Sequence, residues 1–351
     1  MLTGWPAAHA DATINTASGN GAGLILSATL LGTTVASASL PGSVTILGNT
    51  ASVTGGTAAV GSTTSGTPYS VSGSVANLTL TGTTALAIPA HLLPITPLPL
   101  VSTAISATTT LSASLLDAAA SFSNGTLVNS YGGVSDLKLG VGLSSTTTTT
   151  TPGTPPMTLP GGLFLPPSTV KTPLFSLGLT ADALQSTSQI SLINGLLQGT
   201  NTLNSFANVS LDLSSLISLT SLSLPGSSLN RSINLSTIAG ATPVANTTLG
   251  GSTGSLLASL GIMLTLNEQF NTCTSLLTSC SVETNALHLI IDPAIAGLAA
   301  VDLKLGHSYA AATVSAVPEP ATYAMMGLGL VGVMLGARRQ RRHACVASSV
   351  Q

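Results

Sequence analysis

The sequence predicts a mainly β protein: a Ser/Thr/Gly-rich body that is β-sandwich-like or an irregular β structure, followed by one C-terminal transmembrane helix. In the body, short apolar runs are broken by Gly, Asn, Ser and Pro, and polar and apolar residues alternate within them, as in residues 77–81. The helix is predicted from an uncharged apolar stretch, residues 321–337. A β-helix or solenoid is the alternative architecture, although no fixed-period repeat stands out.

The composition argues against several classes of protein. The chain has 351 residues, of which 5% are charged and 3% aromatic, whereas about 25% of an ordinary soluble domain is charged. Its 47 Ser and 50 Thr, together with Asn and Gly, must therefore cover the surface. No basic patch in the body could neutralise phosphates, so nucleic acid is not an expected partner. With 44% hydrophobic residues the chain can bury a core, unlike a charged disordered protein.

The body divides into two predicted β-rich segments, residues 13–143 and 157–313. Residues 144–156, SSTTTTTTPGTPP, form a low-complexity linker between them, or an insertion within one sheet system. Within the body, residues 111–122 and 182–197 are the helix candidates. The remaining body is expected to consist of strands and turns.

The two ends of the chain carry different signals. Residues 1–12, MLTGWPAAHADA, contain small-x-small patterns typical of a secretory cleavage site, but the basic and apolar regions of a signal peptide are missing. They are interpreted as the remnant of a truncated signal peptide, or as a chance match in an alanine-rich stretch. Residues 316–342 form a C-terminal cassette, and residues 343–351 are a tail.

The three cysteines indicate an oxidising compartment. Cys273 and Cys280 lie close together in NTCTSLLTSC, whereas Cys345 follows the cassette. This arrangement favours one short-loop disulfide between Cys273 and Cys280, and two unpaired buried thiols are the alternative. No CxxC motif or nearby histidine supports a metal site there.

The sequence offers few groups for catalysis. No HExxH or GxxxxGK[ST] motif occurs in the body, and neither an enzyme activity nor a cofactor or metal is expected. One set of titratable residues could meet at a metal if their strands were adjacent, although such residues more often occupy polar strand faces or turns. This set contains Glu283, His288, Asp292, Asp302 and His307.

The cassette has three elements in a fixed order. Pro318, Glu319 and Pro320 keep the chain extended, because two prolines bar a regular helix. Residues 321–337 then carry no charge and are just long enough to span a thin bilayer core. Half of the eight basic residues of the chain follow at once, and positive charge beside an apolar helix marks the cytoplasmic side. These are Arg338, Arg339, Arg341 and Arg342.

This order resembles the PEP-CTERM sorting domain. The resemblance implies that Pro318, Glu319 and Pro320 are the recognition motif and that the four arginines stop transfer through the membrane. It further implies an exported protein of a Gram-negative bacterium, with an exosortase and the inner membrane as partners and exopolysaccharide as a candidate partner. The end of the body, residues 285–312, loosely resembles the close of choice-of-anchor families, which are exported β domains with various C-terminal anchors.

We therefore expect an exported, non-enzymatic protein of the cell surface or the biofilm matrix. Its C-terminal helix would anchor it in the inner membrane during sorting, before it reaches the cell surface or the extracellular matrix. The first alternative is a carbohydrate-binding or polysaccharide-active surface protein, against which the low aromatic content argues. The second is a structural adhesin that associates with itself through its uncharged strand edges.

Overall fold

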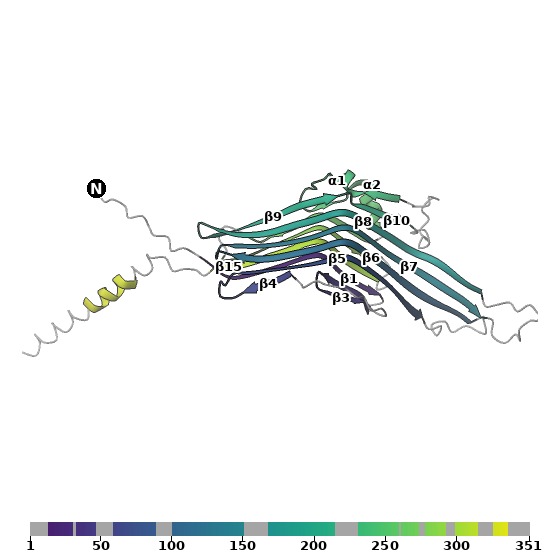
Figure 1. Ribbon diagram of the computed structural model, residues 1–351, viewed down its shortest axis with the longest axis horizontal. Coiled ribbons are helices and arrows are strands. Elements are labelled where there is room, and N and C mark those ends of the chain that lie inside the picture. The colour runs from purple at the N-terminus through teal and green to yellow at the C-terminus, as the bar shows by residue number, and fades with distance from the viewer. Residues whose placement is uncertain are drawn as a thin grey trace, which may run out of the picture.

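The structure is a computed structural model, and it is mainly β, as predicted. The described residues are 13–30, 33–46, 59–88, 100–150, 168–214, 231–259, 261–273, 278–292, 299–314 and 326–335. The strands form two antiparallel sheets that pack against each other, so the body is sandwich-like (Figure 1). The predicted alternative, a β-helix or solenoid, is not the architecture of these residues.

Sheet A has eight strands, in the order β12-β13-β14-β15-β1-β2-β3, with β4 also paired to β1. Its strands are β1 (Ile14–Leu30), β2 (Thr33–Leu40), β3 (Ser43–Ile46), β4 (Ala59–Thr63), β12 (Thr247–Thr248), β13 (Ile262–Asn271), β14 (Ser279–Ile291) and β15 (Ala299–Val314). The strand near the N-terminus therefore lies beside the last strand: Ser18 pairs with Ala311 and Leu24 with Leu305.

Sheet B has seven strands, in the order β11-β10-β8-β7-β6-β5, with β9 also paired to β8. Its strands are β5 (Tyr69–Ile88), β6 (Leu100–Ser123), β7 (Leu127–Thr150), β8 (Ser168–Ile193), β9 (Leu196–Ala207), β10 (Ser210–Ser214) and β11 (Arg231–Asn234). Two short helices, α1 (Leu235–Ala239) and α2 (Gly251–Ser259), follow β11 and precede β13. Strands β6, β7 and β8 are long and run side by side through the whole of sheet B (Figure 1).

The two predicted β-rich segments do not form separate units. Sheet A joins β1–β4 to β12–β15, and sheet B joins β5–β7 to β8–β11, so each sheet takes strands from both sides of the predicted linker. The linker itself begins as strand, because β7 continues to Thr150 and its Thr149 pairs with Ser168 of β8. Local alternation predicts that a strand forms but not which strand it pairs with, which is why the sequence suggested two segments.

Both helix candidates are strands. Residues 111–122 lie in β6, and residues 182–197 lie in β8, the following turn and the start of β9. Leucine and alanine make these stretches good helix formers, but each of them pairs with a long strand on both sides. Tertiary pairing therefore overrides the local propensity.

Two hydrophobic cores lie between the sheets. The larger one includes Leu24, Leu116, Leu179 and Leu289, all fully buried. The smaller core, nearer the start of β1, is built around Phe122 and contains further residues from β1, β7, β8, β9, β14 and β15. Burial of these apolar side chains provides the main driving force for folding.

A waist of small residues separates the two cores. At Gly21 and Gly132 the backbones of the two sheets approach closely. A Cβ on Gly21 would overlap the Tyr131 carbonyl oxygen, and a Cβ on Gly132 would overlap the carbonyl oxygens of Ala22 and His307. Hydroxyl side chains fill the rest of the waist: Ser188 is fully buried and donates to the Ser308 carbonyl oxygen at 2.9 Å. The hydroxyl-rich composition therefore serves the interior as well as the surface, because each of these buried hydroxyl groups has a partner.

The pairing of both sheets is interrupted near mid-strand. In β5 the register passes over Asn77, in β7 over Asp136 and in β13 over Asn267. All three residues have a positive φ, between 50° and 53°, and Asn and Asp adopt that conformation more readily than other side-chain-bearing residues. These interruptions change which residues face inward, and the strands bend at mid-length (Figure 1).

Candidate functional site

The C-terminal cassette is described only in its middle. Residues 326–335 are helical, and the side chains of this stretch are exposed, including Leu328, Val333 and Leu335. Within the part of the chain that the structure describes, no helix is long and apolar enough to cross a membrane. The predicted span, residues 321–337, extends beyond this helix at both ends. The motif Pro318-Glu319-Pro320 and the four arginines lie outside the described residues.

A polar cluster on the outer face of sheet A contains most of the titratable residues that the sequence singled out. Strands β13, β14 and β15 lie side by side and place His288 between two carboxylates. Its Nδ1 lies 2.9 Å from Glu268 Oε2, and its Nε2 lies 2.9 Å from Asp302 Oδ1. Burial alone would lower the pKa of His288, but the hydrogen bonds and charges of Glu268 and Asp302 raise it above its usual value.

The second half of this cluster surrounds Glu283. Lys304 Nζ donates to Glu283 Oε1 at 2.9 Å, and Asn285 Nδ2 donates to Glu268 Oε2 at 2.7 Å. The pKa of Glu268 and the pKa of Glu283 are both lowered, because hydrogen bonds and nearby positive charge outweigh the effect of burial. His307 donates through Nδ1 to Asn285 Oδ1, and its own burial lowers its pKa to about 4. His307 is therefore neutral at physiological pH.

The structure brings together four of the five candidates. Glu283, His288, Asp302 and His307 belong to this cluster, whereas Asp292 is exposed just after β14, where its backbone N–H donates to the Gly261 carbonyl. Among the described residues, no group of three or more His, Cys, Asp or Glu side chains is arranged to hold a metal ion. The carboxylates and imidazoles are instead engaged with one another.

Three members of the cluster, Glu268, Asn285 and Lys304, were not among the candidates from the sequence. Glu268 lies in β13 and Asp302 in β15, with β14 between them in the chain. Only the register reveals that Glu268 pairs with Asn285 and His288 with Lys304. Alternation in β13 gives no signal for Glu268, because it would place Glu268 on the buried face with Leu264 and Leu266. The interruption of the pairing at Asn267 is what turns Glu268 to the other face.

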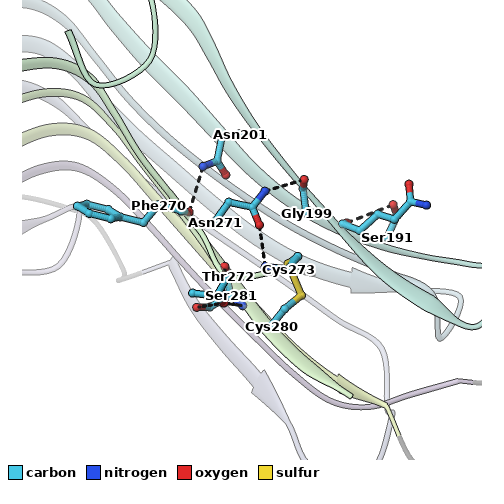
Figure 2. The surroundings of a disulfide bond; sticks show 10 residues. Ser191, Gly199, Asn201, Phe270, Asn271, Thr272, Cys273, Cys280 and Ser281 are labelled. Atoms are coloured by element: carbon cyan, nitrogen blue, oxygen red, sulfur yellow. Dashed lines mark hydrogen bonds between the residues drawn. A yellow bond between two sulfur atoms is a disulfide. The ribbon is translucent and has the colours of Figure 1, made fainter. Parts of the chain in front are cut away.

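A disulfide joins Cys273 and Cys280 where β13 turns into β14 (Figure 2), and their Cα atoms are 4.7 Å apart. Asn271 secures this end of the hairpin: its Oδ1 accepts from the Cys273 N–H at 2.8 Å, and its Nδ2 donates to the Gly199 carbonyl at 3.0 Å. Asn201 of β9 donates to the Phe270 carbonyl at 3.1 Å. These contacts fasten the sheet A hairpin to β9 of sheet B.

An open groove of about 560 Å³ lies beside the disulfide on the outer face of sheet A. Its lining is rich in hydroxyl groups, among them Thr16, Ser18, Ser281 and Thr313. The hydroxyls of Thr16 and Thr313 are hydrogen-bonded to each other. The lining contains no acid, base or aromatic ring, so the groove offers no group for proton transfer or metal binding.

Residues 316–342 match the family model of the PEP-CTERM protein-sorting motif. The match includes Pro318, Glu319, Pro320 and the four arginines, and it confirms the resemblance drawn from the sequence. A motif of this kind implies export, membrane-associated sorting and processing by an exosortase. No curated protein and no solved structure matches the chain.

Proposed function

We propose that this chain is an exported, non-enzymatic protein of the cell surface or extracellular matrix, where exopolysaccharide is its surrounding polymer. The observation that carries the proposal is the sorting motif at residues 316–342, which follows a hydroxyl-rich β body. The disulfide between Cys273 and Cys280 supports an oxidising destination, because such bonds persist outside the cytosol.

In this proposal the cassette holds the chain in the inner membrane until an exosortase acts on it. Residues 321–337 span the bilayer, and Arg338, Arg339, Arg341 and Arg342 stay on the cytoplasmic side. Pro318 and Pro320 keep the recognition segment extended on the opposite side, where a processing enzyme can reach it.

The non-enzymatic part of the proposal rests on how the titratable groups are used. In the outer-face cluster of sheet A, His288 is held by Glu268 and Asp302, and Glu283 is neutralised by Lys304. A general base or nucleophile needs a free position facing a substrate, and these groups face each other instead. The cluster therefore suits the stabilisation of three neighbouring strands.

The sorting proposal is tested in a host that has an exosortase. Replacing Pro318 and Pro320 by alanine removes the extended motif while keeping the apolar stretch and the arginines. We expect this double variant to accumulate in the inner-membrane fraction with an intact C-terminus, while the parent chain is processed and moves on. Ala316→Ser, just before the motif, is the matched control. Unchanged processing and destination of the double variant would contradict the proposal.

A self-associating structural adhesin is a second candidate. Strand β5 (Tyr69–Ile88) stands at one end of the strand order of sheet B and contains no charged residue. The edge strands of a sheet usually carry charged residues that prevent pairing with a second chain. If β5 pairs between copies, light scattering will show a mass that rises with concentration, and Thr79→Lys will reduce it. A constant monomer mass would rule this candidate out.

A further inference from the structure

We propose that a shallow depression on the outer face of sheet B binds a neutral sugar unit of a polysaccharide. This inference deepens the proposed function and rests on it only for the presence of glycans around the exported chain. The depression has a volume of about 550 Å³, within the range of small-molecule sites. Strands β5, β6 and β7 supply its lining, which consists of Ser72, Gly73, Ser74, Asp117, Ala118, Ala119 and Tyr131.

The register of the three strands explains why the surface is hollow here. Ala119 of β6 pairs with Tyr131 of β7, and Asp117 pairs with Gly133. Because Gly133 has no side chain, the Tyr131 hydroxyl and the Asp117 carboxylate meet above it, where a Cβ would collide with both. The side chain of Ala119 is small, so it does not fill the depression beside the Tyr131 ring.

The aromatic ring of Tyr131 is held in a fixed position. Its hydroxyl is hydrogen-bonded to Asp117, and the ring is half-buried, so one part of it remains accessible in the depression. Burial first, and then the Asp117 carboxylate, raise the pKa of Tyr131, which keeps the hydroxyl protonated as a donor. A ring fixed before binding loses little conformational entropy when a ligand stacks on it.

The lining has the chemistry that a sugar ring requires. A pyranose has an apolar face of C–H groups and a rim of hydroxyls, and Tyr131 offers an apolar ring surface for that face. The Asp117 carboxylate accepts hydrogen bonds, and the hydroxyl of the exposed Ser74 can donate or accept them. No basic residue lines the depression. The charge of Asp117 therefore favours a neutral sugar over an anionic one.

The other surfaces of the described body fit such a ligand less well. The hydroxyl-lined groove on sheet A has no ring on which a sugar could stack. In the polar cluster around His288, the carboxylates already bind partners within the cluster. Phe270 on sheet A is 52% exposed, but it does not line either depression. Phe270 therefore provides a matched control for an exposed aromatic ring.

The test uses the full chain in native gels that contain dextran, soluble starch or galactomannan as neutral probes, with alginate as an anionic probe. We expect at least one neutral polymer to retard the chain, and alginate to retard it less. Tyr131→Ala should weaken that binding about tenfold or more, as expected for loss of a central aromatic contact. Tyr131→Phe should retain most of it, Asp117→Asn should weaken it, and Phe270→Ala should leave it unchanged.

Three results of the gel experiment would overturn the proposal. They are no retardation by any neutral polymer, stronger retardation by alginate, and equal retardation of the parent chain and Tyr131→Ala. Circular dichroism shows whether each variant is folded. If Tyr131→Ala does not fold, Asp117→Asn still tests the proposal. If light scattering shows that Tyr131→Ala abolishes a dimer, the occupant is a second copy and not a sugar. The sorting test reads C-terminal processing, so failure of one proposal is distinguishable from failure of the other.

Discussion

The body and the cassette use charge in opposite ways. In the body, Glu283 is paired with Lys304, and His288 bridges Glu268 and Asp302 across three strands. In the cassette, four arginines follow an uncharged stretch, and residues 321–351 contain no acidic residue that could pair with them. The cassette thus works through the linear order of its residues, whereas the body depends on contacts between strands far apart in the chain.

This difference predicts that the two regions can be disrupted separately. Substitutions in the cassette should alter processing and leave the folding of the body unchanged, because the order of its residues carries the signal. Substitutions in the body should alter its stability and leave recognition of the motif unchanged in molecules that still fold.

The largest effect is expected at the waist between the two sheets. Gly132→Val would place a side chain against the carbonyl oxygens of Ala22 and His307, so the sheets could not close. We expect loss of the cooperative thermal transition in circular dichroism, because such overpacking costs more than the few kcal/mol that a small-to-large change in a core usually does. Gly250→Ala is the control, since nothing lies within 4 Å of its added Cβ. Normal melting of Gly132→Val would refute the close approach.

The next largest effect is expected at the disulfide. The double variant Cys273→Ser with Cys280→Ser opens a short loop, and we expect it to lower the free energy of unfolding by about 2 to 3 kcal/mol. Urea denaturation of the oxidised chain measures this change. Cys345→Ser should leave the midpoint where it is, as should reductant added to the double variant. A midpoint that does not move in the double variant would show that the bond adds nothing to stability.

A smaller effect is expected when one buried hydroxyl of the waist is removed. Ser188→Ala deletes the donor to the Ser308 carbonyl and a contact with the Thr284 hydroxyl at 3.0 Å. Since both partners stay buried, the loss should be about 1 to 2 kcal/mol in urea denaturation. Thr200→Ala, at an exposed position of β9, should change stability little. Equal stability of Ser188→Ala and the parent chain would mean that the hydroxyl only fills space.

The last expected effect is a pH dependence of stability with a maximum near pH 6.5. Burial lowers the pKa of His307 to about 4, so its contribution is present above the ordinary value of 6.5 and is lost as the pH falls toward 4. The pKa of His288 is raised by Glu268 and Asp302, so its contribution is present below 6.5 and is lost as the pH rises through the raised value. The melting temperature should therefore fall on both sides.

Two variants separate these contributions. In His288→Gln the melting temperature should no longer decline on the alkaline side, and in His307→Gln it should decline less on the acid side. The decline on the acid side will not disappear completely in His307→Gln. Glu268 and Glu283 have lowered pKa values, and their contribution to stability is lost as the pH falls through those values. An alkaline decline that persists in His288→Gln would assign it to another group.

The sequence predicted the cassette better than the body for a physical reason. The order of Pro318-Glu319-Pro320, apolar stretch and arginines can be recognised in the sequence without knowledge of any contact between residues. In the body, alternation at residues 77–81 correctly indicated a strand, but it did not reveal that Asn77 interrupts the pairing with a positive φ. Strand partners, the waist at Gly132 and the depression at Tyr131 arise from register between distant segments, which local patterns do not encode.

The candidate site shows the same limit. The sequence identified His288, Asp302, Glu283 and His307 by their density, and the structure brings them together because β14 and β15 are neighbours. Asp292 was misplaced because β14 ends at Ile291, so the next residue leaves the sheet. The disulfide partners, Cys273 and Cys280, needed only a short loop between them and were therefore accessible to sequence reasoning.

The most direct test of the proposed sorting is the intact mass of the mature protein, with sequencing of its C-terminus, after expression in a host that has an exosortase. We expect a chain that ends near Pro318-Glu319-Pro320, lacks the arginines and still contains the disulfide between Cys273 and Cys280. A surface-located protein that retains Arg338 to Arg342 would contradict the proposed sorting.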